Sequence, residues 1–311
     1  MAARRIIIDC DPGVDDAMAI LLALASPELD VMALTPVAGN VGLDHTKVNA
    51  LKICELAGRP DIPVYAGCDR PMLRKLRTAS HIHGARGLGA LDLPEPKRSL
   101  QPLHAVDYLI DAVRAADDGE ITICAIGPVT NVALAIHRAP DIVPKLREIV
   151  VMGGTMSLGN ITPSASFNLF VDPHAAHVVF TCGAPVAMVG LDVTMNVIAS
   201  ATRMAPIHAQ TGRVADAVRK LNLSRNDNVP RYGSEDVPLP DTNVIAYLLK
   251  PELYVCKMAN VEVDISSEMN MARTVVDWWD RLGKPKNTLV LNHPDADGVF
   301  ALLAERLASY Q

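Results

Sequence analysis

Short apolar runs alternate with amphipathic stretches through the first two-thirds of the chain. The runs consist mainly of Ile, Val, Ala and Leu, which is typical of strands buried on both faces of a sheet. The stretches between them have apolar residues at helical spacing, and several end at Gly or before Pro. The runs predict strands at Arg5–Asp9, Val31–Val37, Ile62–Ala66, Glu120–Ile126, Glu148–Met152 and Pro185–Leu191. The stretches predict helices at Asp15–Ala25, His45–Ala57, His104–Asp118, Thr130–Arg138, Asp172–Thr181 and Asp241–Leu249.

This order of strands and helices predicts an α/β fold with an open, mainly parallel, Rossmann-like sheet. Consecutive parallel strands need crossover connections, and the helices that provide them cover both faces of the sheet. We find no repeat, low-complexity tract or Gly/Ser linker, so we expect a single domain over residues 1–311. The segment Ser224–Pro240 is polar and holds three prolines, which predicts a long loop.

Composition and charge narrow the classes of function. The formal net charge is −6 and the charges of both signs are interspersed, so we expect no nucleic-acid-binding face. The six cysteines have no CxxC or metal-ligand spacing, which favours reduced thiols in a cytoplasmic protein. The N-terminus lacks the features of a signal peptide, and no apolar stretch approaches the roughly 20 residues of a membrane helix.

Turn-forming and acidic residues follow several of the predicted strands. Ligands of open parallel sheets bind outside the carboxyl ends of the strands, so this edge is where a site is expected. The residues after these strands are Cys10–Asp16, Gly39-Asn40, Gly127-Pro128, Gly153-Gly154 and Asp192.

The segment Asp9–Asp16 (DCDPGVDD) places four aspartates within eight residues. Taken singly, Asp15 or Asp16 could cap the following helix, and Asp9 could be a buried hydrogen-bonding acid. Together the carboxylates repel one another unless a cation or shared protons offset their charge. Carboxylate oxygens suit Ca²⁺ or Mg²⁺ rather than zinc, so the segment predicts a site for a hard divalent cation.

These motifs, together with others along the chain, resemble those of the inosine–uridine-preferring nucleoside hydrolase family. The similarity runs from residue 5 to about residue 195 and returns at Asp241, within DTNVIAYLL. The order and spacing of the motifs make a chance match implausible. The matching segments are Asp9–Asp16, Gly39-Asn40, His81–Gly84, Met152–Gly154, Gly159-Asn160, Phe167-Asn168 and Asp172-Pro173.

The resemblance implies hydrolysis of the bond between a ribose and its base, with a Ca²⁺ ion at the strand ends. The implied ligands are Asp11, Asp16, the main-chain carbonyl of Ile126, and Asp241. The ion would hold the attacking water and the ribose 2′- and 3′-hydroxyls, and Asp11 would also be the general base. Family members also lead us to expect a homo-oligomer, a dimer or a tetramer.

The resemblance also assigns residues to the substrate. Asn40 has an alternative role as a turn residue, and Asn168 as an amide that caps a loop. His83 corresponds to a position near the base. The implied contacts to the diol side of the ribose come from Asp15, Asn40, Asn168 and Asp241, and those towards its 5′ end from Met152, Asn160 and the position of Ser166.

Two positions depart from the family pattern. Many members have a histidine before the third aspartate that protonates the leaving base, and here that position is Pro240. Members usually have a glutamate that contacts the 5′-hydroxyl, and here it is Ser166. A substitute acid would come from Asn226–Asp236, but the sequence does not choose among the candidates Tyr232, Glu235 and Asp236.

Two other functions deserve comparison with a nucleoside hydrolase. A DxD motif at a strand end also occurs in Mg²⁺-dependent phosphohydrolases, but these need a Thr or Ser and a Lys after later strands, and Gly127-Pro128 and Gly153-Gly154 offer neither. A non-catalytic module that binds ribosides is the second alternative, because Pro240 cannot donate a proton. His174 and His177 have no acidic partner nearby in sequence and are expected to be surface residues.

Overall fold

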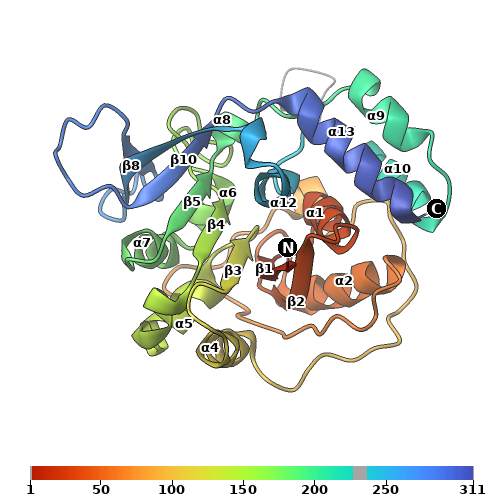
Figure 1. The fold of residues 1–311 in the computed structure, drawn as a ribbon, viewed down its shortest axis with the longest axis horizontal. Coiled ribbons are helices and arrows are strands. Elements are labelled where there is room, and N and C mark those ends of the chain that lie inside the picture. Colours follow the sequence, from red (N-terminus) through yellow and green to blue (C-terminus); the bar gives the residue numbers. More distant parts are fainter. Residues whose placement is uncertain (1, 227–236, 311) are drawn as a thin grey trace.

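A central sheet organises the chain, for which a computed structural model describes residues 2–226 and 237–310, without the side chains of 224–226 (Figure 1). Its strands are β1 (Arg4–Cys10), β2 (Leu29–Pro36), β3 (Ile121–Ala125), β4 (Glu148–Met152), β5 (Val186–Val189), β8 (Val255–Val263), β9 (Thr274–Asp277) and β10 (Thr288–Asn292). Their order is β2-β1-β3-β4-β5-β10-β8-β9. The strands from β2 to β10 pair in parallel, whereas β8 and β9 pair antiparallel. The predicted α/β class with a mainly parallel sheet is confirmed.

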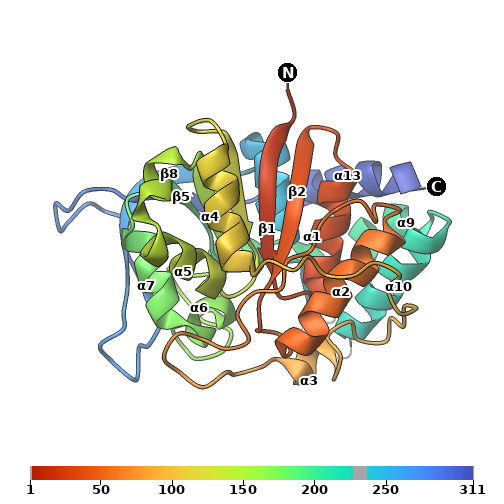
Figure 2. The ribbon, with the colours of Figure 1, turned by 90° about the horizontal axis from the view of Figure 1, so that it is seen from below.

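Helices cover both faces of this sheet (Figures 1 and 2). One layer consists of α1 (Val14–Leu24), α2 (Leu43–Leu56), α9 (Ala201–His208), α10 (Arg213–Asn226), α12 (Thr242–Leu249) and α13 (Ala296–Leu307). The other layer consists of α4 (Ala105–Ala115), α5 (Thr130–Arg138) and α7 (Pro173–Thr181). Each layer packs its apolar face against the sheet, so the sheet separates two hydrophobic cores.

Strand β1 shows why continuous apolar runs form the centre of this sheet. Successive side chains of a strand point to opposite faces. Ile6 and Ile8 therefore pack into the core beneath α1, whereas Ile7 packs into the core beneath α4 and α5. All three are fully buried, so both faces of β1 are apolar between Arg5 at its start and Asp9 near its end.

Short elements lie mainly around the carboxyl ends of the parallel strands. In Figure 2, β1 and β2 run downward from the N-terminal side, and α3 and α6 lie at the lower edge. This edge is also where Asp11 follows β1 and Gly127 follows β3. Within residues 2–226 and 237–310, the short elements are α3 (Ser80–His83), α6 (Phe167–Val171), α8 (Leu191–Thr194), β6 (Ile198–Ala199), β7 (Val237–Pro238), and the 3-10 helices Pro140–Lys145, Pro251–Leu253 and Ala308–Tyr310.

Two of the predicted segments differ from the structure. Ile62–Ala66 is not a strand, because only an isolated parallel bridge joins Val64 to Leu34 of β2, and Pro63 has no N–H to donate to a ladder. Of the predicted loop Ser224–Pro240, α10 takes up the start as far as Asn226 and β7 occupies Val237–Pro238, and residues 227–236 lie outside the described part of the chain. Strands β8, β9 and β10 were not predicted. None of the described helices is both long and apolar enough to cross a membrane.

Candidate functional site

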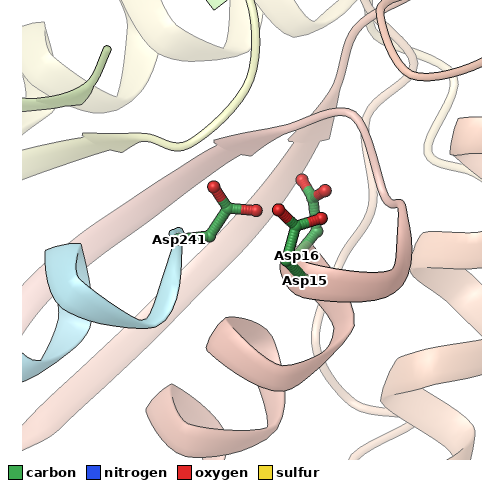
Figure 3. A group of neighbouring side chains, drawn as sticks. All are labelled: Asp15, Asp16 and Asp241. Atoms are coloured by element: carbon green, nitrogen blue, oxygen red, sulfur yellow. The ribbon is translucent and has the colours of Figure 1, made fainter. Parts of the chain in front are cut away.

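Three aspartates from two distant parts of the sequence meet at the carboxyl edge of the sheet. Asp15 and Asp16 lie in the first turn of α1, and Asp241 immediately precedes α12. One carboxylate oxygen from each lies within 4.8 Å of the others, and Figure 3 shows the three side chains facing a common space. Asp16 and Asp241 are buried, and two helix N-termini lie beside the cluster. The structure therefore brings together acids that are more than 200 positions apart.

Asp16 organises the loop that joins β1 to α1. Its Oδ1 accepts a hydrogen bond from the main-chain N–H of Asp11 at 3.0 Å, and its Oδ2 accepts from Gly13 N–H at 2.9 Å. The Nδ2 of Asn40 donates to the same Oδ2 at 3.1 Å and to the carbonyl oxygen of Asp11 at 3.2 Å. The charge of Asp16 is thus met by three N–H groups, and these bonds fix the position of Asp11.

The Asp11 carboxylate is fully buried between two glycines. Its Oδ2 accepts from the main-chain N–H of Asn40 at 2.6 Å, whereas its Oδ1 has no hydrogen-bond partner among the described residues. A Cβ on Gly39 would lie 2.1 Å from Oδ2, and one on Gly127 would lie 2.7 Å from Oδ1. Only glycine lets the loops after β2 and β3 approach this carboxylate so closely.

Burial and mutual repulsion make these carboxylates difficult to ionise in the ion-free protein. Burial and then the charge of Asp15 raise the pKa of Asp16 to about 7. Burial and then the charge of Asp16 raise the pKa of Asp11 well above its usual value. A divalent cation would offset this unfavourable charge.

The donor set fits a hard divalent cation. The cluster of Asp15, Asp16 and Asp241 offers only oxygen atoms. The buried Oδ1 atoms of Asp11 and Asp15 accept no hydrogen bond from the described residues, which leaves them available as ligands. The cluster could therefore hold a metal ion.

The Ile126 carbonyl is held by an amide from α6. Asn168 Nδ2 donates to this carbonyl oxygen at 2.7 Å and to the carbonyl oxygen of Met152 at 3.2 Å. The two carbonyls lie at the ends of the neighbouring strands β3 and β4, and Asn168 is buried. Asn168 thus ties two strand ends together, a role that differs from the loop cap considered for it above.

A single cavity at this edge contains most of the predicted site. Asp11 and Asp16 do not line it, but their bonds to Asn40 place them directly behind its wall. The predicted residues that line it are Asp15, Asn40, His83, Ile126, Met152, Asn160, Ser166, Asn168 and Asp241. Pro240 also lines it, whereas Tyr232, Glu235 and Asp236 lie outside the described residues.

Two residues that the sequence assigns to the 5′ end of the ribose, Ser166 and Asn160, form hydrogen bonds with the main chain. Ser166 Oγ accepts from Gly154 N–H at 2.7 Å, and Asn160 Oδ1 accepts from Phe167 N–H at 2.8 Å. Ser166 is fully buried. Ser166 therefore supports the loop after β4.

His83 is the histidine best placed to act on a ligand. It is buried, lines the cavity, and accepts a hydrogen bond at Nδ1 from Val14 N–H at 3.1 Å. A neutral imidazole that accepts at Nδ1 has its proton on Nε2. The Asp15 carboxylate lies 3.7 Å from the same Nδ1.

Asp9, His174 and His177 do not line the cavity, whereas His81 does. Asp9 Oδ1 accepts from Thr35 Oγ1 at 2.7 Å and from Asn131 Nδ2 at 2.8 Å, which suits the structural role expected of it. His174 and His177 lie on α7, half-buried rather than fully exposed, and do not line the cavity.

Several lining residues were not predicted. Thr194 and Met195 follow β5, so the same strand-end rule that found Asn40 could have found them. Other lining residues carry no sequence signal of their own, because they are apolar or lie in β7. They include Ala79, Ile161, Leu191, Val237 and Pro238.

Comparison with known proteins agrees with this geometry. The sequence pattern of the inosine-uridine preferring nucleoside hydrolase family matches residues 6–301. An uncharacterised protein of Schizosaccharomyces pombe is 46% identical over 97% of this chain and 98% of its own length. The pyrimidine-specific ribonucleoside hydrolase RihB of Escherichia coli is 40% identical over 100% of this chain and 99% of its own.

A solved structure extends the agreement to the fold. The plant nucleoside hydrolase PpNRh1 superposes with a TM-score of 0.92 at 34% identity, over 98% of this chain and 99% of that one. Family and fold thus agree over nearly the full length of the chain. The protein belongs to the inosine-uridine preferring nucleoside hydrolase family, and is accordingly an enzyme that acts on N-glycosyl bonds.

Proposed function

We propose that this protein hydrolyses ribonucleosides or related N-ribosides to ribose and a free base, with a bound Ca²⁺ ion and Asp11 as the general base. The observation that carries the proposal is the meeting of Asp15, Asp16 and Asp241 beside a cavity. Directly behind its wall lies Asp11, whose Oδ1 has no hydrogen-bond partner in the described part of the chain. The full-length similarity to a ribonucleoside hydrolase supports the same chemistry.

The proposed ligands are Asp11, Asp16, the Ile126 carbonyl and Asp241. A bound divalent ion supplies a Lewis acid that lowers the pKa of water and anchors hydroxyl groups. Calcium is proposed because carboxylate and carbonyl oxygens in an irregular arrangement suit its flexible coordination.

Asp11 accepts the proton of the attacking water at Oδ1. Its Oδ2 is already bound to Asn40 N–H, and this bond orients the carboxylate. A carboxylate must be ionised to act as a base, and burial in the ion-free protein raises the pKa of Asp11. The positive charge of a bound ion would lower this pKa and favour the ionised form.

The remaining residues hold the ribose and stabilise its positive charge. Breaking an N-ribosidic bond gives the sugar oxocarbenium character, which nearby carboxylates such as Asp15 stabilise. Asn168 uses Nδ2 for the strand-end carbonyls, so its Oδ1 is the atom that accepts from a ribose hydroxyl. Asn40 and Asp241 contact the 2′- and 3′-hydroxyls of the ribose, and Met152 and Asn160 contact its 5′ end.

The residue that protonates the leaving base is the part of the mechanism that the described residues assign least directly. Pro240 has no proton to donate, and His83 is the described residue best placed to replace it. The bond from Val14 N–H leaves its Nε2 as the protonated nitrogen. Tyr232, Glu235 and Asp236 are the other candidates.

The test is release of reducing sugar from uridine, cytidine, inosine and adenosine, first with EGTA and then with Ca²⁺ restored. Ribose release should disappear with EGTA and return with Ca²⁺. Asp241→Asn should lower the rate of ribose release, whereas Asp92→Asn, on the exposed surface, should leave it unchanged. Binding of ribosides without ribose release would identify the non-catalytic module. Cleavage of p-nitrophenyl phosphate instead of ribosides would identify the phosphohydrolase.

A further inference from the structure

A second cavity adjoins the proposed ribose site. Asn160, Leu191 and Met195 line both cavities, so the two share part of their walls. The second cavity has a volume of about 740 Å³, within the range of roughly 300–1,000 Å³ of small-molecule sites. Its other lining residues are Ser157, Leu158, Gly159, Asp192, Asn196, Asn292, His293 and Pro294.

The chemistry of this second cavity is partly apolar and partly polar. Leu158 is an exposed apolar side chain on its wall, with 77% of its surface accessible. The carboxylate of Asp192 is already bound, because Oδ2 accepts from Met156 N–H at 2.6 Å and Oδ1 accepts from Ser157 Oγ at 2.8 Å. His293 has a φ of 43°, a left-handed conformation that non-glycine residues adopt infrequently and that is often found at functional sites.

The boundary between the two cavities is adjustable. Met195 is 37% exposed, and its unbranched side chain can change rotamer at little cost. Ser166, which also lines the first cavity, is small and uncharged, and its Oγ already accepts from Gly154 N–H. A ligand that extends past Asn160 therefore meets a small neutral residue and a movable methionine.

We propose that the second cavity binds a substituent on the 5′ carbon of the ribose, and that the enzyme accepts ribosides extended at this position. This rests on the proposed function, because the orientation of the ribose follows from its diol lying beside the aspartates. The substituent that fits best is uncharged and partly apolar, such as a short alkyl thioether. It packs on Leu158 and Met195, and Asn196 and Asn292 lie on the polar part of the wall.

The same residues disfavour a 5′-phosphate. Asp192 places a negative charge on the wall, and among the described lining residues only His293 can become positively charged. Burying a dianion beside a carboxylate is unfavourable. A 5′-nucleotide is therefore expected to be a poor substrate, which separates this cavity from a nucleotide site.

The test uses p-nitrophenyl ribofuranoside, its 5-deoxy-5-butylthio derivative and its 5-phosphate, so that base preference plays no part. The kcat/KM of the butylthio derivative should be at least equal to that of the parent, whereas the phosphate should be lower by about a hundredfold. Leu158→Trp, which fills the second cavity, should lower kcat/KM for the butylthio derivative by about tenfold and leave the parent unchanged. Asn196→Trp provides a second filling variant.

Leu73→Trp is the matched control, because Leu73 is 74% exposed and does not line either cavity. It should affect neither substrate. A butylthio derivative that is cleaved about a hundredfold more slowly than the parent, or equal losses on both substrates in the filling variants, would overturn the inference. Failure to cleave the parent riboside itself would instead contradict the proposed function.

Discussion

The side-chain amide of Asn168 donates to the main-chain carbonyl of Ile126 at 2.7 Å. This bond connects a residue proposed to hold the ribose with a carbonyl proposed to hold calcium. The Asn168 amide, at the ends of β3 and β4, is therefore part of both the proposed ribose contact and the proposed metal site. Occupation of one is expected to favour occupation of the other, because each orders the same amide.

Calcium removal is the first test of the site. We expect the purified protein to bind about one Ca²⁺ per chain and to lose both activity and thermal stability in EGTA, because the ion binds only the folded state. Elemental analysis and melting curves with and without EGTA measure both effects. Bound zinc, or activity that survives chelation, would mean that the role of the aspartate cluster has been misassigned.

The ion-free protein should lose stability as the pH rises. Burial and Asp15 raise the pKa of Asp16 to about 7, against about 3.9 in an unfolded chain. Between these values the folded state keeps a proton that the unfolded state has released, so the free energy of unfolding falls with increasing pH. Melting temperatures in EGTA should therefore be higher at pH 5 than at pH 8.

The same melting temperatures measured in saturating Ca²⁺ are the control for this pH effect. The ion stabilises the ionised carboxylates, so the fall in melting temperature between pH 5 and pH 8 should become smaller or reverse. Asp9 has a pKa raised to about 7 by its own burial, and its contribution should persist with or without Ca²⁺. A melting temperature in EGTA that increases from pH 5 to pH 8 would contradict the prediction.

Asp11→Asn should preserve the fold but lower turnover by about a hundredfold or more, because it removes the general base and weakens the metal site. The amide is nearly isosteric, and it keeps an oxygen for Asn40 N–H. Asp44→Asn, on the exposed surface of α2, is the control and should behave as the unmodified protein. Near-normal turnover in a folded Asp11→Asn variant would rule out the proposed mechanism.

The sequence predicted the aspartate site from local patterns. Asp11 and Asp16 lie between a β-branched run and a helical stretch, so their position at a strand end followed from periodicity alone. Asp241 carries no such local signal, and only the resemblance to a known family placed it beside Asp15. The structure then brings the two together within one cluster.

Other parts of the structure could not be predicted from the sequence, because they are determined by tertiary contacts. β8 and β9 lie at one end of the sheet, where side chains such as Met258 and Val275 are exposed, so their sequences lack the continuous apolar pattern of the central strands. The predicted strand Ile62–Ala66 had the right composition, but it makes only a bridge to β2. The bond from Val14 N–H to His83 joins segments about 70 residues apart, and no pattern in the sequence indicated it.

Ser166 should reduce the dependence of the reaction on the 5′-hydroxyl. A bond to a carboxylate contributes roughly 1.5–3 kcal/mol, and a bond between neutral groups about 1 kcal/mol. The 5′-deoxy analogue should therefore lose only about tenfold in kcat/KM. The analogue is a better probe than a Ser166 variant, because Ser166 also binds Gly154 N–H. A loss near a thousandfold would show that another residue binds this hydroxyl.

Pro240 should make the rate depend strongly on the leaving group. General acid catalysis contributes typically 10²–10⁴-fold, or roughly 3–5.5 kcal/mol of barrier, and a purine anion leaves slowly without it. p-Nitrophenolate needs no proton, so p-nitrophenyl riboside should be cleaved much faster than inosine. The measurement is kcat/KM for both substrates under the same conditions. Pro240→His should recover part of the inosine activity, provided that the loop into Asp241 keeps its shape.

Comparable rates on the two substrates would contradict this prediction and show that another residue supplies the proton. His83 would then be tested first, because Val14 N–H fixes its tautomer with the proton on Nε2. If His83 is the acid, His83→Gln should lower activity on inosine by about a hundredfold and leave p-nitrophenyl riboside nearly unchanged, since only the purine needs a proton. His45→Gln, on the exposed surface of α2, is the matched control. Equal losses on both substrates would instead indicate that His83 shapes the cavity, and the acid would be sought by mutating Tyr232, Glu235 and Asp236 one at a time.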